Sequence, residues 1–183
     1  GHSGSPAMYN YSFQKLGLDY VYLAFDIKEE DTSKAINALR LLNVKGFNIT
    51  MPGKTAALSC CDELSKAAQL IGAVNTVVNE NGKLIGHNTD GLGWVRNCRE
   101  HGFEIRGKKM TIAGSGGAAT AIEITSALEG MSEISIFARK DTFFANAEAT
   151  VEKIRRHVSG CRVNLYDLED RDLFYHEIED SHI

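Results

Sequence analysis

The stretch Gly114-Ser115-Gly116-Gly117-Ala118-Ala119 decides the fold of this chain. It lies between an apolar, β-branched run at 109–113 and a helical pattern at 119–128. In such a strand–turn–helix unit, one glycine allows a sharp turn, a second lets the backbone approach a pyrophosphate, and Ala119 stands where the helix packs on the strand. The N-terminus of the helix then favours the anion through its free N–H groups and its dipole. The motif predicts a dinucleotide held by Gly114, Ser115, Gly116, Gly117 and Ala118.

Regular alternation of strands and helices surrounds this turn. Three apolar runs have the length and residue types of strands: 109–113, 133–137 and 162–166. Helical patterns at 119–128 and 143–156 separate them. Strands that alternate with helices form βαβ units and a parallel sheet. We therefore expect a Rossmann-type nucleotide domain over 92–183, incomplete at its end; another α/β fold, such as a methyltransferase that binds one adenosine, is the alternative.

The residues before this domain predict a second α/β unit. Helices are expected at 6–16 with Ser5 as N-cap, from Asp31 or Thr32 to about 42, at 54–60, at 63–70 and at 89–101. Strands are expected at 20–25, 47–51, 73–79 and 83–87, the last two joined by the hairpin signal Asn81-Gly82. The predicted fold class is thus two α/β domains, an N-terminal substrate domain at 1–91 and the nucleotide domain at 92–183.

Composition and charge exclude several classes of partner. The chain has 183 residues, a hydrophobic fraction of 43% and a net charge of -4, so neither nucleic acid nor an anionic membrane surface is an expected partner. Its apolar runs are too short to span a bilayer. The four cysteines have neither a disulfide-framework spacing nor a zinc signature, so no metal is expected. A reducing cytoplasm is the expected localisation.

Short segments of the first domain are unusually polar for the ends of strands. They are 3–6, 48–54 and 86–91, with Asn75-Thr76 as a fourth. Each residue alone has an ordinary explanation: Lys54 is then a surface lysine, and residues 1–5 are a cloning remnant. Together, these hydroxyls, amides, one lysine and one aspartate suit a small polyhydroxylated carboxylic acid.

In combination with the glycine turn, these segments resemble the shikimate dehydrogenase family, including its quinate/shikimate dehydrogenase branch. The matching stretches, which occur in the order and at the spacing of the family, are Gly1 to Asn10, Asn48 to Lys54, Gly72 to Thr76, Asn88 to Gly91 and Gly114 to Ala119. The resemblance covers nearly the whole chain. It implies two α/β domains with a substrate site in the first and a dinucleotide site in the second.

The resemblance also implies roles for individual residues. Ser3 and Ser5 would bind the substrate carboxylate. Thr50, Asn75 and Asp90 would contact the ring hydroxyls. Lys54 and Asp90 would form the catalytic pair, in which the lysine ammonium stabilises the developing alkoxide and donates its proton while the carboxylate orients both groups.

The expected cofactor is NAD or NADP. The residues after the second strand of the nucleotide domain include features that favour each of the two. Ala138, Arg139, Lys140 and Asp141 are expected to contact its adenosine end. A carboxylate there favours the ribose hydroxyls of NAD, whereas Arg139 and Lys140 suit the 2′-phosphate of NADP. The run from Arg139 to Phe144 resembles the quinate/shikimate branch, which implies NAD with NADP tolerated.

The expected activity is an oxidoreductase that interconverts shikimate and 3-dehydroshikimate, and quinate and 3-dehydroquinate as a second pair, in the supply of aromatic amino acid precursors. The alternative is a non-catalytic NAD(P)-binding sensor of the same fold; the retained Lys54 and Asp90 argue against it. Because segments that the family has on both sides are missing here, we expect this polypeptide by itself to be inactive. A homodimer is left open.

Overall fold

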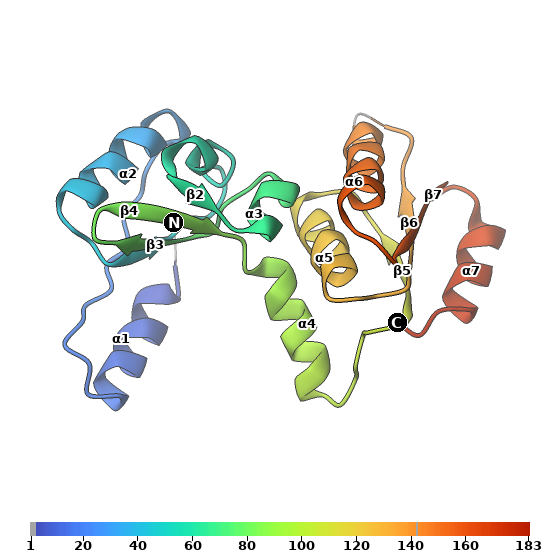
Figure 1. Cartoon of the computed structure of the whole chain (residues 1–183), viewed down its shortest axis with the longest axis horizontal. Coiled ribbons are helices and arrows are strands. Elements are labelled where there is room, and N and C mark those ends of the chain that lie inside the picture. Colours follow the sequence, from blue (N-terminus) through green and yellow to red (C-terminus); the bar gives the residue numbers. More distant parts are fainter. Residues whose placement is uncertain (1–2, 142) are drawn as a thin grey trace.

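A computed structural model describes residues 3–141 and 143–183 and contains two separate sheets (Figure 1). Gly1, His2 and Thr142, which belong to stretches that resemble the family, lie outside the described residues. The first half contains α1 (Ser5–Lys15), η1 (Glu29–Asp31), α2 (Thr32–Leu41), β1 (Gly46–Asn48), η2 (Ala56–Cys60), β2 (Glu63–Leu64), α3 (Lys66–Ile71), β3 (Thr76–Glu80) and β4 (Lys83–His87). The second half contains α4 (Asp90–Glu100), β5 (Lys109–Ala113), α5 (Gly117–Leu128), β6 (Glu133–Ala138), α6 (Phe144–His157), β7 (Arg162–Asp167) and α7 (Arg171–Glu179).

The first sheet is built on the predicted hairpin. Strands β3 and β4 pair antiparallel, and the turn between them has φ of 56° at Asn81 and 95° at Gly82. Two successive positive φ values are those of a type I′ turn, whose twist matches the strands that it joins, so the hairpin prediction is confirmed. Strand β1 adds antiparallel to β3 and β2 adds parallel to β4, which gives the order β1-β3-β4-β2.

Several sequence-based assignments in this half are wrong. The segment 20–25 is not a strand: it has no strand neighbour within the described residues, so its aromatic and β-branched side chains lack the cross-strand contacts that β structure requires. The helix expected at 63–70 begins only at Lys66, because Glu63 and Leu64 pair with β4 and Ser65 caps the helix by accepting from the Ala68 N–H. The helix expected at 54–60 is the 3₁₀ helix η2, and β1 ends at Asn48, before a turn in which the Gly53 N–H bonds the Thr50 carbonyl.

The second sheet is parallel, in the order β5-β6-β7, as the alternating pattern predicts. Its strands and the helices α5 and α6 fall within two residues of their predicted bounds. The helix α7 was not predicted from the sequence. After it, the chain returns to β5, where the His182 N–H bonds the Lys109 carbonyl and the Thr111 N–H bonds the Ile183 carbonyl. The fold class, with a Rossmann-like parallel sheet in the second half, is confirmed.

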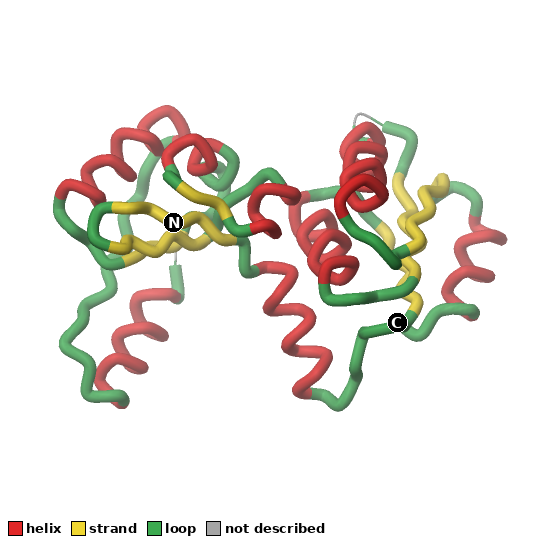
Figure 2. The backbone as a smooth tube through the Cα atoms, viewed as in Figure 1, coloured by secondary structure: helices red, strands yellow, loops and turns green. Residues whose placement is uncertain are grey.

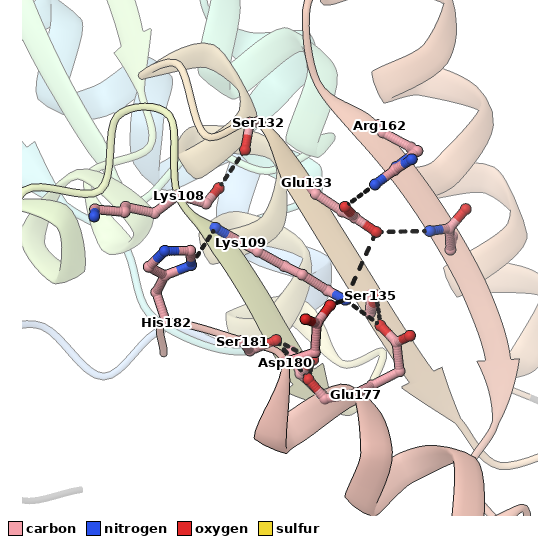
Figure 3. Close-up of polar contacts among 12 residues, drawn as sticks. Lys108, Lys109, Ser132, Glu133, Ser135, Arg162, Glu177, Asp180, Ser181 and His182 are labelled. Atoms are coloured by element: carbon pink, nitrogen blue, oxygen red, sulfur yellow. Dashed lines mark hydrogen bonds and ion pairs between the residues drawn. The ribbon is translucent and has the colours of Figure 1, made fainter.

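One face of this parallel sheet is polar where its strands begin. Lys109, Glu133 and Arg162 stand opposite one another in the register, and the Lys109 ammonium is 2.9 Å from Glu177 and 2.6 Å from Asp180 on or just after α7 (Figure 3). Burial lowers the pKa of Lys109, but its hydrogen bonds to Asp180 and Glu177 outweigh this and hold the pKa above the ordinary value. Helix α7 is therefore fixed to the sheet by charge as well as by apolar contact.

The two halves are joined by packing of helices α3 and α4, which lie between the sheets (Figures 1 and 2). The core of the first sheet is small and includes Ile36, Val77 and Leu84. The larger core of the second sheet takes in Leu70 of α3 and Val95 of α4. The larger core thus includes α3, which comes from the first half of the sequence. The domain boundary at residue 91 stays a prediction. No described helix is long and apolar enough to cross a membrane.

Glycine is required where α4 meets α5. A Cβ atom on Gly91 would lie 2.1 Å from the Ala121 carbonyl oxygen and 2.3 Å from the Thr125 hydroxyl. Gly93, two residues further along α4, has nothing within 4 Å of the corresponding point. Of these two glycines, only Gly91 is therefore required for the close approach of the two helices.

We expect Gly91→Ala to lower the free energy of unfolding by about 2–3 kcal/mol, because α4 must move away from α5. The matched control Gly93→Ala, on the open side of the same helix, is expected to stabilise the protein by up to ~1 kcal/mol through helix propensity. Chemical denaturation of both variants checks this. Equal stabilities of the two variants would contradict the packing argument.

A buried acid lies within α5. Glu123 is fully buried, and neither of its carboxyl oxygens has a hydrogen-bond partner among the described residues. Desolvation raises its pKa from 4.5 to about 8. Below pH 4.5 the carboxyl is protonated in both folded and unfolded chains; above it, only the unfolded chain ionises freely. Glu123 therefore costs stability progressively as the pH rises from about 5 to about 8.

We compare the free energy of unfolding of the unsubstituted protein with that of the Glu123→Leu variant. Between pH 5 and 8 we expect the first to fall relative to the second by about 1.4 kcal/mol per pH unit. Urea titrations of both proteins across this range measure the difference. Glu148→Leu, at an exposed position on α6, is the control and should run parallel to the unsubstituted protein. A Glu123→Leu profile that is also parallel would show that the carboxyl does not resist ionisation.

Candidate active site

Lys54 and Asp90, far apart in the sequence, form a direct ion pair. The Lys54 Nζ is 2.6 Å from the Asp90 Oδ2, and the two side chains are 22% and 38% exposed. Lys54 lies between the turn after β1 and η2, and its carbonyl accepts from the Val74 N–H just before β3. Asp90 begins α4, directly after β4. Both residues thus lie at one end of the first sheet, in contact with each other and partly exposed.

Asn75 determines the orientation of the Asp90 carboxylate. The Asn75 Oδ1 accepts from the Thr89 backbone N–H at 3.0 Å, and a backbone N–H is always a donor. The amide nitrogen of Asn75 must therefore face the other way, where it donates to the Asp90 Oδ1 at 2.8 Å. Asp90 therefore accepts from Asn75 through one carboxylate oxygen and from Lys54 through the other, which fixes its orientation.

A chain of hydrogen bonds extends from Asn75 across the sheet. The Thr76 hydroxyl donates to the Asn75 Oδ1 at 2.9 Å, and the Asn48 Nδ2 donates to the Thr76 oxygen at 3.1 Å. The Tyr22 hydroxyl donates to the Asn48 Oδ1 at 3.2 Å. The Lys54–Asp90 pair is thereby connected to the segment that follows α1.

The two serines lie at the N-terminus of α1. Ser5 is the first residue of the helix and Gly4 is its N-cap, so the assignment of Ser5 as N-cap is wrong. The Ser3 oxygen instead accepts from the Ser5 N–H at 3.3 Å. The Ser5 N–H is thus used by Ser3, Pro6 has no N–H, and the Met8 N–H bonds the Gly4 carbonyl. The two hydroxyls and the Ala7 N–H are the donors that this end of α1 offers to a carboxylate. Thr50, two residues after β1, is exposed.

The glycine turn has the geometry of a pyrophosphate site. Gly114 has a φ of 133°, which an L side chain rarely adopts, and its N–H bonds the Phe137 carbonyl at the end of β6. Cβ atoms on Gly116 and Gly117 would meet nothing within 4 Å, so a ligand can approach the backbone there. Helix α5 begins at Gly117 with its first N–H groups unbonded within the helix. The residues present therefore fit a dinucleotide.

The end of β6 and the segment after it present one buried residue and three charged groups. Ala138 is 1% exposed, so its methyl lies in the core. Arg139 and Lys140 are exposed, and the Lys140 Nζ is 3.1 Å from Asp167. The Asp141 carboxylate accepts from the Phe143 N–H at 2.8 Å. Arg139 thus offers its charge to a ligand, whereas the two charges that follow it already have protein partners.

Sequence reasoning placed Lys54, Asn75 and Asp90 in one site, and the structure brings these three into direct contact. It missed Tyr22 and Asn48 as members of the same network. Asn48 opens the polar segment 48–54, which was a usable signal; nothing local in the sequence marks Tyr22. No group of residues that could hold a metal ion occurs within 3–141 and 143–183.

Comparisons with known proteins agree with this geometry. Residues 1–77 match the family described as shikimate dehydrogenase substrate binding domain. The chain is 53% identical over 180 residues to shikimate dehydrogenase (NADP(+)) of Listeria innocua, covering 98% of this chain and 62% of the relative. The chain thus spans less than two thirds of that relative's length.

Solved structures are similar in fold as well as in sequence. A crystal structure of shikimate 5-dehydrogenase from Listeria monocytogenes in complex with shikimate and NAD has a TM-score of 0.95 and 53% identity, over 98% of this chain and 62% of that chain. The ligand-free 5-ketofructose reductase of a Gluconobacter strain has a TM-score of 0.82 and 33% identity, over 91% and 59%. The first similarity extends over nearly all of this chain at high identity, and it agrees with the match to residues 1–77. This chain is therefore similar to shikimate dehydrogenases over nearly its whole length, and its residues 1–77 match their substrate binding domain.

Proposed function

We propose that this chain forms the substrate site and part of the dinucleotide site of an oxidoreductase that interconverts shikimate and 3-dehydroshikimate with NAD or NADP. The observation that carries this proposal is the Lys54–Asp90 ion pair at 2.6 Å. Asp90 begins α4, and its neighbour Gly91 packs against Ala121, four residues after the start of α5. The pair and the glycine turn are therefore separated by a distance on the order of 10 Å, which a dinucleotide can span.

The bound dinucleotide would supply or accept the hydride. Lys54 donates a proton to the carbonyl oxygen on the ring when the ketone is reduced, and it accepts the hydroxyl proton when the alcohol is oxidised. Its positive charge stabilises the oxygen as negative charge develops on it. Asp90 holds the ammonium in place, and Asn75 holds Asp90, so neither group needs to reorganise during the reaction.

The substrate would lie between the N-terminus of α1 and this pair. Ser3 and Ser5 receive its carboxylate. Thr50, Asn75 and Asp90 receive the ring hydroxyls. Quinate, which is a similar hydroxylated carboxylic acid, is the second substrate that we propose for the same groups.

For the cofactor we favour NAD, with NADP also used. In the NAD complex, Asp141 would face the ribose hydroxyls, and Gly114 to Ala118 would hold the pyrophosphate. Arg139 supports the use of NADP, because it is exposed and a guanidinium binds phosphate oxygens well. The relatives named above include one described as NADP(+)-dependent and one solved with NAD, which supports a site that accepts both.

We also propose a domain boundary at residue 91, a cytoplasmic location and a homodimer. In this proposal the two halves act together in catalysis. A sensor of the same fold would have no need of the Lys54–Asp90 pair.

We expect Lys54→Ala to lower kcat for shikimate oxidation by about 10²–10⁴-fold, because a positioned acid–base group contributes on this scale. The KM should change far less, because the interaction is made mainly in the transition state. Steady-state rates with shikimate and each dinucleotide, in the longest natural polypeptide that carries this sequence, check this. Lys66→Ala on the exposed side of α3 is the control. An unchanged kcat would refute the role of Lys54, and an inactive unsubstituted protein would favour the sensor.

We expect Arg139→Ala to raise the KM for NADP about 10-fold and to leave the KM for NAD within about twofold, since only NADP has the 2′-phosphate that pairs with the guanidinium. Initial rates at saturating shikimate measure both constants. Arg156→Ala, at the exposed end of α6, serves as the control for loss of positive charge. Equal changes for the two cofactors would rule out a contact between Arg139 and the 2′-phosphate.

A further inference from the structure

Tyr22 is an exception within an exposed stretch of chain. Every residue from 14 to 30 is exposed except Tyr22, which is partly buried. Its backbone is held on both sides by one side chain: the Asn10 Nδ2 donates to the Tyr22 carbonyl at 2.9 Å, and the Tyr22 N–H donates to the Asn10 Oδ1 at 2.7 Å. Its ring stacks on Tyr9, with centroids 4.7 Å apart and planes 16° apart. Helix α1 therefore fixes this one residue of the segment.

The fixed tyrosine places its hydroxyl between the two ends of the substrate site. It donates to the Asn48 Oδ1 at 3.2 Å, at the start of the network that leads to Asp90. Burial raises the pKa of Tyr22, the neighbouring Tyr9 raises it further, and hydrogen bonds with the Ser5 side chain and the Asn48 backbone lower it in part. The Tyr22 side chain thus connects α1, which carries Ser5, to the network that ends at the ion pair.

We propose that Tyr22 is a positioning residue, whose hydroxyl keeps α1, which carries Ser5, and the Asn48 network at one fixed separation. The inference rests on the proposed function, since it assigns the carboxylate to Ser5 and a ring hydroxyl to Asp90. A rigid cyclic acid has its carboxylate and its reacting hydroxyl at a constant distance. The protein groups at the two ends come from α1 and from the first sheet. Tyr22 is held to α1 by Asn10 and Tyr9, and its hydroxyl donates to Asn48 of the first sheet.

Tyr22→Phe tests the hydroxyl alone, because the Asn10 clamp and the stacked ring remain. In the longest natural polypeptide that carries this sequence, we expect the KM for shikimate to rise about 10-fold while kcat changes less than about threefold, as for the loss of one hydrogen bond used in ground and transition states alike. The KM for the dinucleotide should change less than about twofold, and the melting temperature should change by less than ~2 °C. Tyr20→Phe is the matched control, since the Tyr20 ring is exposed and packs on Phe13.

A double-mutant cycle identifies the route of the effect. If Tyr22 acts through Asn48, the KM change in the double variant Tyr22→Phe/Asn48→Ala should fall short of the product of the single changes by at least ~3-fold. A KM within twofold of the unsubstituted enzyme in Tyr22→Phe, or full multiplicativity in the cycle, would overturn the proposal. A merely structural role would lower kcat through loss of active enzyme and leave the KM unchanged.

The side-chain amide resonances of Asn48 provide a readout that needs no activity. They should shift in Tyr22→Phe and stay in place in Tyr20→Phe, because only the first substitution removes a hydrogen bond to Asn48. If the unsubstituted protein does not turn over shikimate, the proposed function fails, and these resonances still decide whether Tyr22 holds Asn48. Resonances of Asn48 that do not move in Tyr22→Phe would overturn the inference independently of the reaction.

Discussion

The close approach of α4 to α5 at Gly91 is the constraint on which the arrangement of the whole site depends. A residue with no side chain lets α4 lie against the Ala121 carbonyl and Thr125. Asp90 precedes this contact directly, and the glycine turn precedes α5 directly. Two helix N-termini, one carrying a carboxylate and one suited to a phosphate, are therefore brought near each other by backbone packing, before any ligand contributes.

Within the first half, backbone donors determine which way the polar side chains face. The Thr89 N–H fixes the Asn75 oxygen, so the Asn75 nitrogen must bond to Asp90, and Asp90 is left to accept from Lys54. Each hydrogen bond is ordinary, but the Asn75 amide cannot be turned around. Its nitrogen would then face the Thr89 N–H, and its oxygen would face the Asp90 carboxylate. An ion pair that is only partly buried owes its geometry to this network more than to its own attraction, because an exposed pair gains little energy by itself.

The second half contains polar groups in places where a parallel sheet is usually apolar. Lys109 is paired with acids from α7, so its charge is compensated. Glu123 has no such partner among the described residues, and the fold retains it in its neutral form by desolvation. Paired charges therefore strengthen one contact of the sheet, whereas a carboxyl that must stay neutral lowers the stability of the helix that follows the glycine turn.

The sequence by itself determined the parallel sheet, the glycine turn and the hairpin at Asn81-Gly82, because each rests on local spacing and residue type. The candidate trio Lys54, Asn75 and Asp90 came from the resemblance of the sequence to the shikimate dehydrogenase family. Only the tertiary structure decided that the 20–25 segment forms no strand, that α7 seals a polar face, and that Tyr22 and Asn48 belong to the site. Strand formation requires a partner strand, and a hydrogen-bond network requires atoms from α1, β1, β3 and α4 to meet. Local sequence encodes neither, since both depend on residues that are distant along the chain.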